Sequence, residues 1–172
     1  MNVMTPTATT HTNDLERIAD TTAHTNDLER IADTTANACI ATRVRQLSRI
    51  VTRVYDDAMR PLGITASQFT LLTQLASRDG ITAVEIGADL DIEKSTLSRN
   101  LKRMLALTLI TMDPPAGRRG RGLHLTPKGQ AVIKEAYPVW LAAQNRAVSL
   151  MGPETRGTLD ALLGNAERLV TD

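Results

Sequence analysis

The chain has 172 residues, which suits one domain with a tail, and its 42% of hydrophobic residues can supply an aliphatic core. Aromatic residues make up only 2%, which argues against a single-stranded nucleic-acid site, because such sites stack bases on aromatic rings. The net charge of +1 conceals an uneven distribution: residues 94–121 carry seven basic and one acidic side chain, whereas residues 1–37 carry two and six. Such a concentrated basic segment is typical of a surface that contacts nucleic acid.

The residues that could carry other functions are few. The single cysteine, Cys39, excludes an intrachain disulfide and favours a reducing cytoplasm, and its spacing from the three histidines predicts no metal site. There is no signal-peptide pattern and no apolar run of membrane-spanning length, so we expect a cytoplasmic protein that does not associate with membranes. Because no nucleophile–base pair and no phosphate-binding glycine loop is evident, we predict neither an enzyme nor a bound cofactor.

The first 37 residues form an acidic, threonine-rich segment with a tandem repeat. The 13 residues HTNDLERIADTTA occur at 11–23 and again at 24–36. Each copy has a helix-capping pattern, but a shift of one copy turns a helix by about 220°, so the apolar side chains of the two copies would not share one stripe. We therefore expect a flexible tail over 1–37; the alternative is an acidic arm that docks on a partner subunit.

From residue 38 onwards the apolar residues recur with helical spacing. The pattern predicts a dimerisation helix within 38–64, and capping boxes at 65–68 and 82–85 then open two short helices. A tight turn at Asp91 precedes a further helix, expected from about Glu93 to Thr108, with its leucines and methionine facing inward.

After this helix the apolar period changes to two. The flanks of the Pro-, Gly- and Arg-rich segment 114–120 alternate like strands, which predicts a hairpin with a basic tip. Thr126-Pro127 then caps a long helix, and a last helix follows Gly152-Pro153. The predicted fold is mainly α with a small β-hairpin wing: a winged helix-turn-helix lobe over 65–126, with dimerisation helices over 38–64 and 127–172.

The helix near 93–108 is the predicted DNA-reading element, because the major groove of B-DNA admits one such helix. The short hydroxyls of Ser95, Thr96 and Ser98 allow close approach, and Arg99 suits bidentate reading of guanine. Residues further along the helix hold phosphates, and the wing arginines enter the minor groove. The predicted DNA-binding residues are Lys94, Ser95, Thr96, Ser98, Arg99, Lys102, Arg103, Arg118, Arg119 and Arg121.

Two other interpretations of the basic residues stay open. On an isolated helix they would more often form a solvated face, but here two basic elements flank a helix-turn-helix in the order that DNA binding requires. The second alternative is a winged-helix protein-interaction module without DNA binding. Unpartnered apolar faces on the first helix and on the last two helices predict a homodimer, and a homodimer would read a pseudo-palindromic operator on double-stranded DNA.

Six short motifs follow one another along the chain: Leu62-Gly63-Ile64-Thr65, Gln68-Phe69-Thr70-Leu71-Leu72, Glu85-Ile86-Gly87-Ala88-Asp89-Leu90, Lys94-Ser95-Thr96-Leu97-Ser98-Arg99, Arg118-Arg119-Gly120 and Leu125-Thr126-Pro127-Lys128-Gly129. Through these motifs the chain resembles the MarR (multiple antibiotic resistance regulator) family from about Cys39 to Asp172. The resemblance implies a dimeric cytoplasmic transcription regulator, usually a repressor, that leaves DNA when a small phenolic or other lipophilic effector binds or when a cysteine is oxidised.

Three positions depart from the family pattern. Gly117 stands where an aspartate usually braces the wing arginine, so that ion pair is expected to be missing. Glu93 replaces the aspartate that opens the reading helix and is a poorer cap, and Asp91 replaces a glycine of the turn. These differences leave DNA binding intact and put the wing geometry in doubt.

Four residues are candidates for sensing a ligand or an oxidant. Cys39 lies close to the position of the reactive cysteine in the peroxide-sensing branch of the family, although a lone cysteine is more often a small buried hydrophobe. Arg43, Tyr55 and Trp140 are candidates for the ligand crevice that the family places between the dimerisation helices and the DNA-binding lobe. Each of the three could also be an ordinary core or surface residue without a role in ligand binding.

Overall fold

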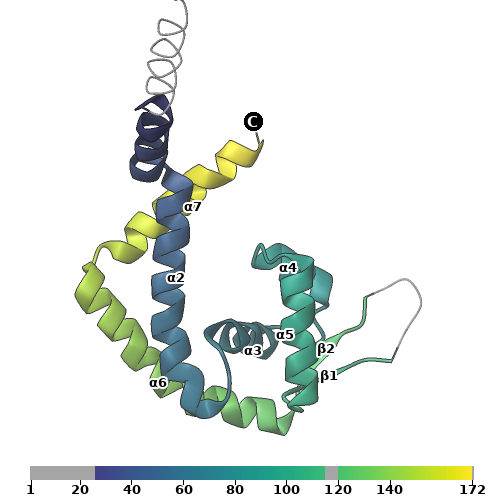
Figure 1. Cartoon of the computed structure of the whole chain (residues 1–172). Coiled ribbons are helices and arrows are strands. Elements are labelled where there is room, and N and C mark those ends of the chain that lie inside the picture. The colour runs from purple at the N-terminus through teal and green to yellow at the C-terminus, as the bar shows by residue number, and fades with distance from the viewer. Residues whose placement is uncertain (1–25, 115–119, 172) are drawn as a thin grey trace, which may run out of the picture. The chain divides into compact units, whose positions relative to one another are not determined.

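The computed structural model describes residues 26–114 and 120–171 (Figure 1). This part of the chain divides into two units, with the boundary after Ser48. In the first unit, residues 26–38 are helical and α2 (Ile40–Met59) begins after Cys39. Where the sequence predicts a flexible tail up to residue 37, the second copy of the repeat is thus helical from residue 26, since its Ala, Leu, Glu and Arg favour a helix. The first copy lies outside the described residues.

Almost nothing is buried in the described part of the first unit. Every residue over 26–48 is exposed except the half-buried Cys39. The exposed side chains include large apolar ones, among them Ile40 and Val44 near the start of α2. A helical face of this kind gains stability only when another surface covers it.

The second unit contains the hydrophobic core. Its elements are the rest of α2, the 3-10 turn η1 (Arg60–Leu62), α3 (Ala66–Ser77), α4 (Ala83–Asp89), α5 (Lys94–Ala106), β1 (Ile110–Met112), β2 (Leu123–Leu125), α6 (Pro127–Met151) and α7 (Thr155–Thr171). Side chains from the end of α2, from α3, α4 and α5, from the hairpin and from α6 are buried together. The largest buried apolar side chains are Met59, Leu71, Leu72, Leu75, Ile86, Met104, Ile110 and Leu123.

Both predicted capping boxes are present and set where the short helices begin. The Thr65 hydroxyl accepts from the Gln68 backbone N–H at 3.2 Å, and the Gln68 side chain accepts from Thr65 N–H at 3.1 Å. Thr82 and Glu85 make the same reciprocal pair at 3.3 and 2.8 Å. Each box satisfies N–H groups that a helix start leaves unpaired, so these boundaries are specified locally.

The wing is an antiparallel hairpin whose inner face joins the core. Ile110 pairs with Leu125 and Met112 with Leu123, and a further bridge links Thr82 to Gly122. Its tip, residues 115–119, lies outside the described residues. Among the residues that the structure describes, no helix is both long and apolar enough to span a membrane.

Candidate nucleic-acid interface

Helix α5 has one buried and one polar face. Leu97, Leu101 and Met104 are buried in the core of the second unit. The seven predicted DNA-binding residues of this helix are exposed: Lys94, Ser95, Thr96, Ser98, Arg99, Lys102 and Arg103. The burial pattern therefore leaves lysine, serine, threonine and arginine side chains, which suit hydrogen bonding or phosphate contact, on one accessible surface.

The turn at Asp91 and the N-cap residue Glu93 hold the start of α5. Asp91 has φ of +48°, the left-handed conformation that the turn requires and that Asp tolerates better than most residues. The sequence predicts Glu93 to be a poorer cap than aspartate, yet its carboxylate accepts from the backbone N–H groups of Ser95 at 2.8 Å and Thr96 at 3.0 Å. A hydrogen bond from the Ser95 hydroxyl, together with these two backbone bonds, lowers the pKa of Glu93. The carboxylate thus stays ionised at the positive end of the helix dipole.

Three of the predicted base-reading side chains, those of Ser95, Thr96 and Arg99, already have partners in α5 or at its N-cap. The Ser95 hydroxyl donates to Glu93, so towards DNA it is an acceptor. The Arg99 guanidinium donates to the Thr96 hydroxyl at 3.1 Å, and the Asn100 amide donates to the Thr96 carbonyl at 3.1 Å. Reading guanine with Arg99 therefore requires that it leave Thr96 or contact the base with Thr96 beside it.

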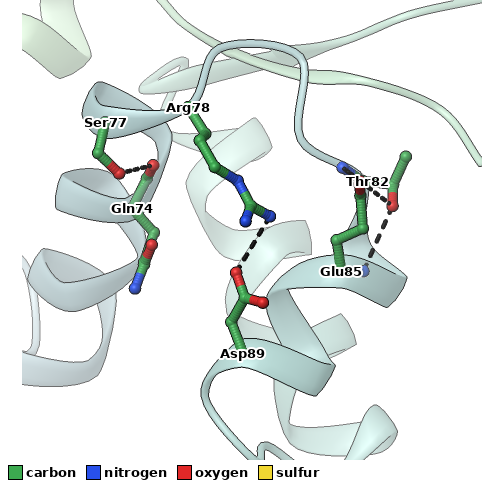
Figure 2. A network of polar contacts seen from close by, with 6 residues as sticks. All are labelled: Gln74, Ser77, Arg78, Thr82, Glu85 and Asp89. Carbon is green, nitrogen blue, oxygen red and sulfur yellow. Dashed lines mark hydrogen bonds and ion pairs between the residues drawn. The ribbon is translucent and has the colours of Figure 1, made fainter.

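A polar network fixes α4 relative to the end of α3 (Figure 2). Arg78, which follows α3, pairs with Asp89 at the end of α4, with 3.0 Å between guanidinium nitrogen and carboxylate oxygen. The Ser77 hydroxyl donates to the Gln74 carbonyl in the last turn of α3, and the Thr82–Glu85 capping box opens α4 on the other side. Figure 2 shows Arg78 reaching across from one helix to the other, so the ion pair ties together the two helices that precede the reading helix.

The start of α6 supports the C-terminal end of α5. The sequence predicts a reading helix up to about Thr108, but α5 ends at Ala106 because Thr108 adopts a left-handed φ of +56°. The Lys128 ammonium donates to the Leu107 carbonyl at 2.8 Å, and the Thr126 hydroxyl donates to Thr108 O at 2.7 Å. A cation at a helix C-terminus stabilises the free carbonyls there.

The basic wing is only partly described. Arg118 and Arg119, together with Gly117, lie outside the described residues, so the missing wing brace stays a prediction. Arg121 is exposed, and its side chain donates to the backbone carbonyl of Asp113 on the other side of the hairpin. Of the three predicted wing contacts, only Arg121 is therefore placed, at the base of the hairpin.

A histidine at the base of the wing was not identified as a candidate from the sequence. His124 in β2 has its Nδ1 atom 2.9 Å from Asp79 Oδ1 and its Nε2 atom 3.1 Å from Asp113 Oδ1. The bond to Asp79 raises the pKa of His124, and the bond to Asp113 adds to this, while desolvation opposes both. No spacing rule finds this cluster, because Asp79 is 45 positions away and reaches His124 only through the fold.

An apolar groove lies directly beside the reading helix. It has a volume of about 630 Å³ and is formed by α4, α5 and β1. Its apolar lining includes Val84, Ile92 and Met112, and Lys94, Ser98 and Lys102 of α5 also line it. A molecule in this groove would therefore touch three of the predicted DNA-binding residues.

The four predicted sensing residues are divided between the two units. Cys39 is half-buried, and a hydrogen bond with Thr42 lowers its pKa, while Arg43 is exposed on α2. In the second unit the Tyr55 hydroxyl donates to Gln144 at 2.5 Å, and burial raises its pKa. Trp140 lies near the Phe69 ring, with 6.4 Å between ring centroids.

A second cavity lies between the end of α2 and α6, and it is lined by residues other than the predicted sensing residues. It has a volume of about 650 Å³ and is lined by Val54, Asp57, Ala58, Pro138, Val139, Ala142, Ala143 and Arg146. Neither Tyr55 nor Trp140 lines it. Their contacts in the structure are those of packed, hydrogen-bonded side chains.

Comparison with known proteins identifies a family that shares these features. A model of the MarR family matches residues 62–120. The multiple antibiotic resistance protein MarR of Salmonella typhimurium is 34% identical over 86 residues, which make up 49% of this chain and 60% of that protein. The chain thus aligns with less than two thirds of the length of this relative, and the same holds for the MarR protein of Escherichia coli.

Two solved structures are similar over nearly their whole length. The M. tuberculosis transcriptional regulator MosR is 32% identical with a TM-score of 0.68, and the similarity covers 77% of this chain and 98% of MosR. A structure of M. tuberculosis MosR in complex with DNA is 31% identical with a TM-score of 0.67, and the similarity covers 76% of this chain and 98% of that one.

Proposed function

We propose that this chain, which belongs to the MarR family of regulators, is a sequence-specific transcription regulator that binds double-stranded DNA and acts as a repressor. The observation that carries the proposal is the polar face of α5, where seven DNA-binding candidates are exposed while Leu97, Leu101 and Met104 anchor the helix in the core. The similarity to a regulator that has been solved with DNA supports it.

The roles along α5 follow from chemistry and position. Arg99, in the second turn of the helix, presents a planar fork that matches two acceptors on guanine. Lys102 and Arg103 lie one turn further along and suit phosphate contact, which positions the helix without reading sequence. Arg118, Arg119 and Arg121 of the wing would add contacts in the minor groove.

The functional molecule is proposed to be a homodimer on a pseudo-palindromic operator. Each unit exposes apolar side chains, with Ile40 and Val44 on α2 and Leu159, Leu162 and Leu163 on α7. Exposed apolar surface of this kind is typical of a subunit interface. Two copies would present two reading helices to successive major grooves.

A small phenolic or lipophilic effector is proposed to bind in the groove formed by α4, α5 and β1. Its walls are mainly apolar, and Lys94 and Lys102 can pair with a phenolate or carboxylate. A bound effector would compete for the lysines and Ser98 that the DNA contacts need. Ala83→Leu, which fills the groove, should abolish release of DNA by a panel of hydroxybenzoates. Ala142→Leu in the α2–α6 cavity is the matched control and should leave release unchanged.

The test of the function itself is a binding titration on the DNA upstream of the protein's own gene, at about 50 and 200 mM salt. Arg99→Ala should weaken the free energy of binding to this DNA by about 1–3 kcal/mol and relax the sequence specificity of the protein. Lys102→Ala should weaken operator and random DNA alike and reduce the salt slope by about one. An absence of binding at both salt concentrations would instead favour the protein-interaction module.

A further inference from the structure

The base of the wing holds a bridge that neutral histidine cannot complete. His124 lies between two carboxylates, each within hydrogen-bond distance of a different ring nitrogen. An ionised carboxylate only accepts hydrogen bonds, and a neutral imidazole carries one N–H. Both bonds can therefore form together only when His124 is an imidazolium.

The three side chains come from three separate segments. Asp79 follows α3, Asp113 follows β1, and His124 is the middle residue of β2. The bridge thus joins the two strands of the hairpin to each other and to the end of α3. Since the two carboxylates face different ring nitrogens, they do not converge on one point as ligands of a metal would.

Glycine at position 122 makes room for this arrangement. A side-chain carbon on Gly122 would lie 2.5 Å from Asp113 Oδ2 and 3.1 Å from the Gly80 carbonyl oxygen. The carboxylate of Asp113 therefore packs over a glycine backbone, and the turn at Gly80, with φ of +74°, brings Asp79 alongside.

We propose that His124, as an imidazolium between Asp79 and Asp113, is a positioning residue that fixes the wing hairpin against the end of α3 and so supports DNA binding. The consequence for DNA rests on the proposed function, whereas the bridge itself does not.

The pH dependence has a definite sign. Other charged groups nearby are committed elsewhere, since Arg121 donates to the Asp113 backbone carbonyl and Arg78 pairs with Asp89. Because the bridge raises the pKa of His124, its contribution is complete below about pH 6.5 and is lost as pH rises through the raised value. The wing should therefore hold DNA more weakly above neutral pH.

The first experiment measures the bridge without DNA. Histidine NMR titration of the full-length protein should give His124 a pKa above about 6.5, and Asp79→Asn should lower it. Hydrogen exchange at the Asp113 and Leu123 amides, which bond to Gly122 O and Ile81 O, should be faster in His124→Gln than in the wild type at the same pH below neutral. A pKa at or below 6.5 that Asp79→Asn leaves unchanged would overturn the proposal.

The second experiment measures affinity for the upstream DNA between about pH 6 and pH 9. The wild type should lose about two- to fivefold, and His124→Gln and Asp79→Asn should show a flat profile at the weaker level. The double variant His11→Gln/His24→Gln is the matched control and should retain the wild-type profile. An equal pH slope in His124→Gln would overturn the role in DNA binding. Absence of DNA binding at every pH, with the NMR result intact, would uphold the bridge and overturn the proposed function instead.

Discussion

Replacing Gly129 with alanine tests the close approach of α6 to the backbone of Leu109. A side-chain carbon at this position, in the first turn of α6, would lie 2.1 Å from the Leu109 carbonyl oxygen and 3.2 Å from the Leu125 side chain. Ordinary carbon–oxygen contacts are about 3.3 Å or longer, so the backbone must separate by about 1 Å. The Leu109 carbonyl also accepts from the Thr126 N–H at 3.1 Å, and the Gly129 N–H donates to the Thr126 hydroxyl at 3.0 Å.

The cost follows from these contacts. Two hydrogen bonds at about 1 kcal/mol each, with disturbed packing of the buried Leu109, give a loss of about 3 kcal/mol in the free energy of unfolding. Urea denaturation followed by far-ultraviolet circular dichroism, at a fixed protein concentration, measures this loss.

Gly157→Ala is the matched control. Gly157 lies in α7 with open space around it, on the side of the helix opposite Leu159, Leu162 and Leu163 at 100° per residue. There alanine should stabilise the protein by up to about 1 kcal/mol. If Gly129→Ala changed stability by less than about 0.5 kcal/mol, the close approach of α6 to Leu109 would be refuted.

Two further predictions concern single side chains. Hydrogen bonds from Ser95 and Thr96 hold the pKa of Glu93 below its ordinary value, so its contribution is present above about pH 4.5 and is lost as pH falls through the lowered value. Glu93→Gln should therefore speed hydrogen exchange of the Ser95 and Thr96 amides at neutral pH. The extra protection that the wild type loses at acid pH should be absent in this variant. Unchanged exchange rates would show that Glu93 does not cap the helix. Because the bond with Thr42 lowers the pKa of Cys39, Thr42→Val should slow alkylation of Cys39 by iodoacetamide near neutral pH. Equal alkylation rates would show that Thr42 does not activate the thiol.

Local patterns predict much of this fold because they act within a few residues. The Thr65–Gln68 and Thr82–Glu85 boxes form as their spacing indicates, and the inward positions of α5 follow from helical periodicity. The paired strands likewise follow from the change to a period of two. These features need no knowledge of distant parts of the chain.

Other parts of the site depend on geometry that spacing does not carry. The His124 bridge needs the hairpin register and the turn at Gly80 to bring three segments together. The end of α5 was predicted two residues late, because the left-handed conformation of Thr108 is not the usual choice of a β-branched residue. The capping strength of Glu93 depends on a side-chain rotamer that lets one carboxylate reach two N–H groups.

The bond between Arg99 and Thr96 has a consequence for how the protein would search DNA. On a wrong base pair Arg99 keeps a partner, so the guanidinium is not left unbonded against an unsuitable base edge. The penalty for a mismatch is then smaller than desolvation of an unpaired cation would impose. On the correct guanine, one bond to a hydroxyl is exchanged for two bonds to the base. On random sequence Arg99 would thus stay bonded to Thr96 while the protein slides along DNA. Its side chain would extend towards a base only where the exchange of bonds is favourable.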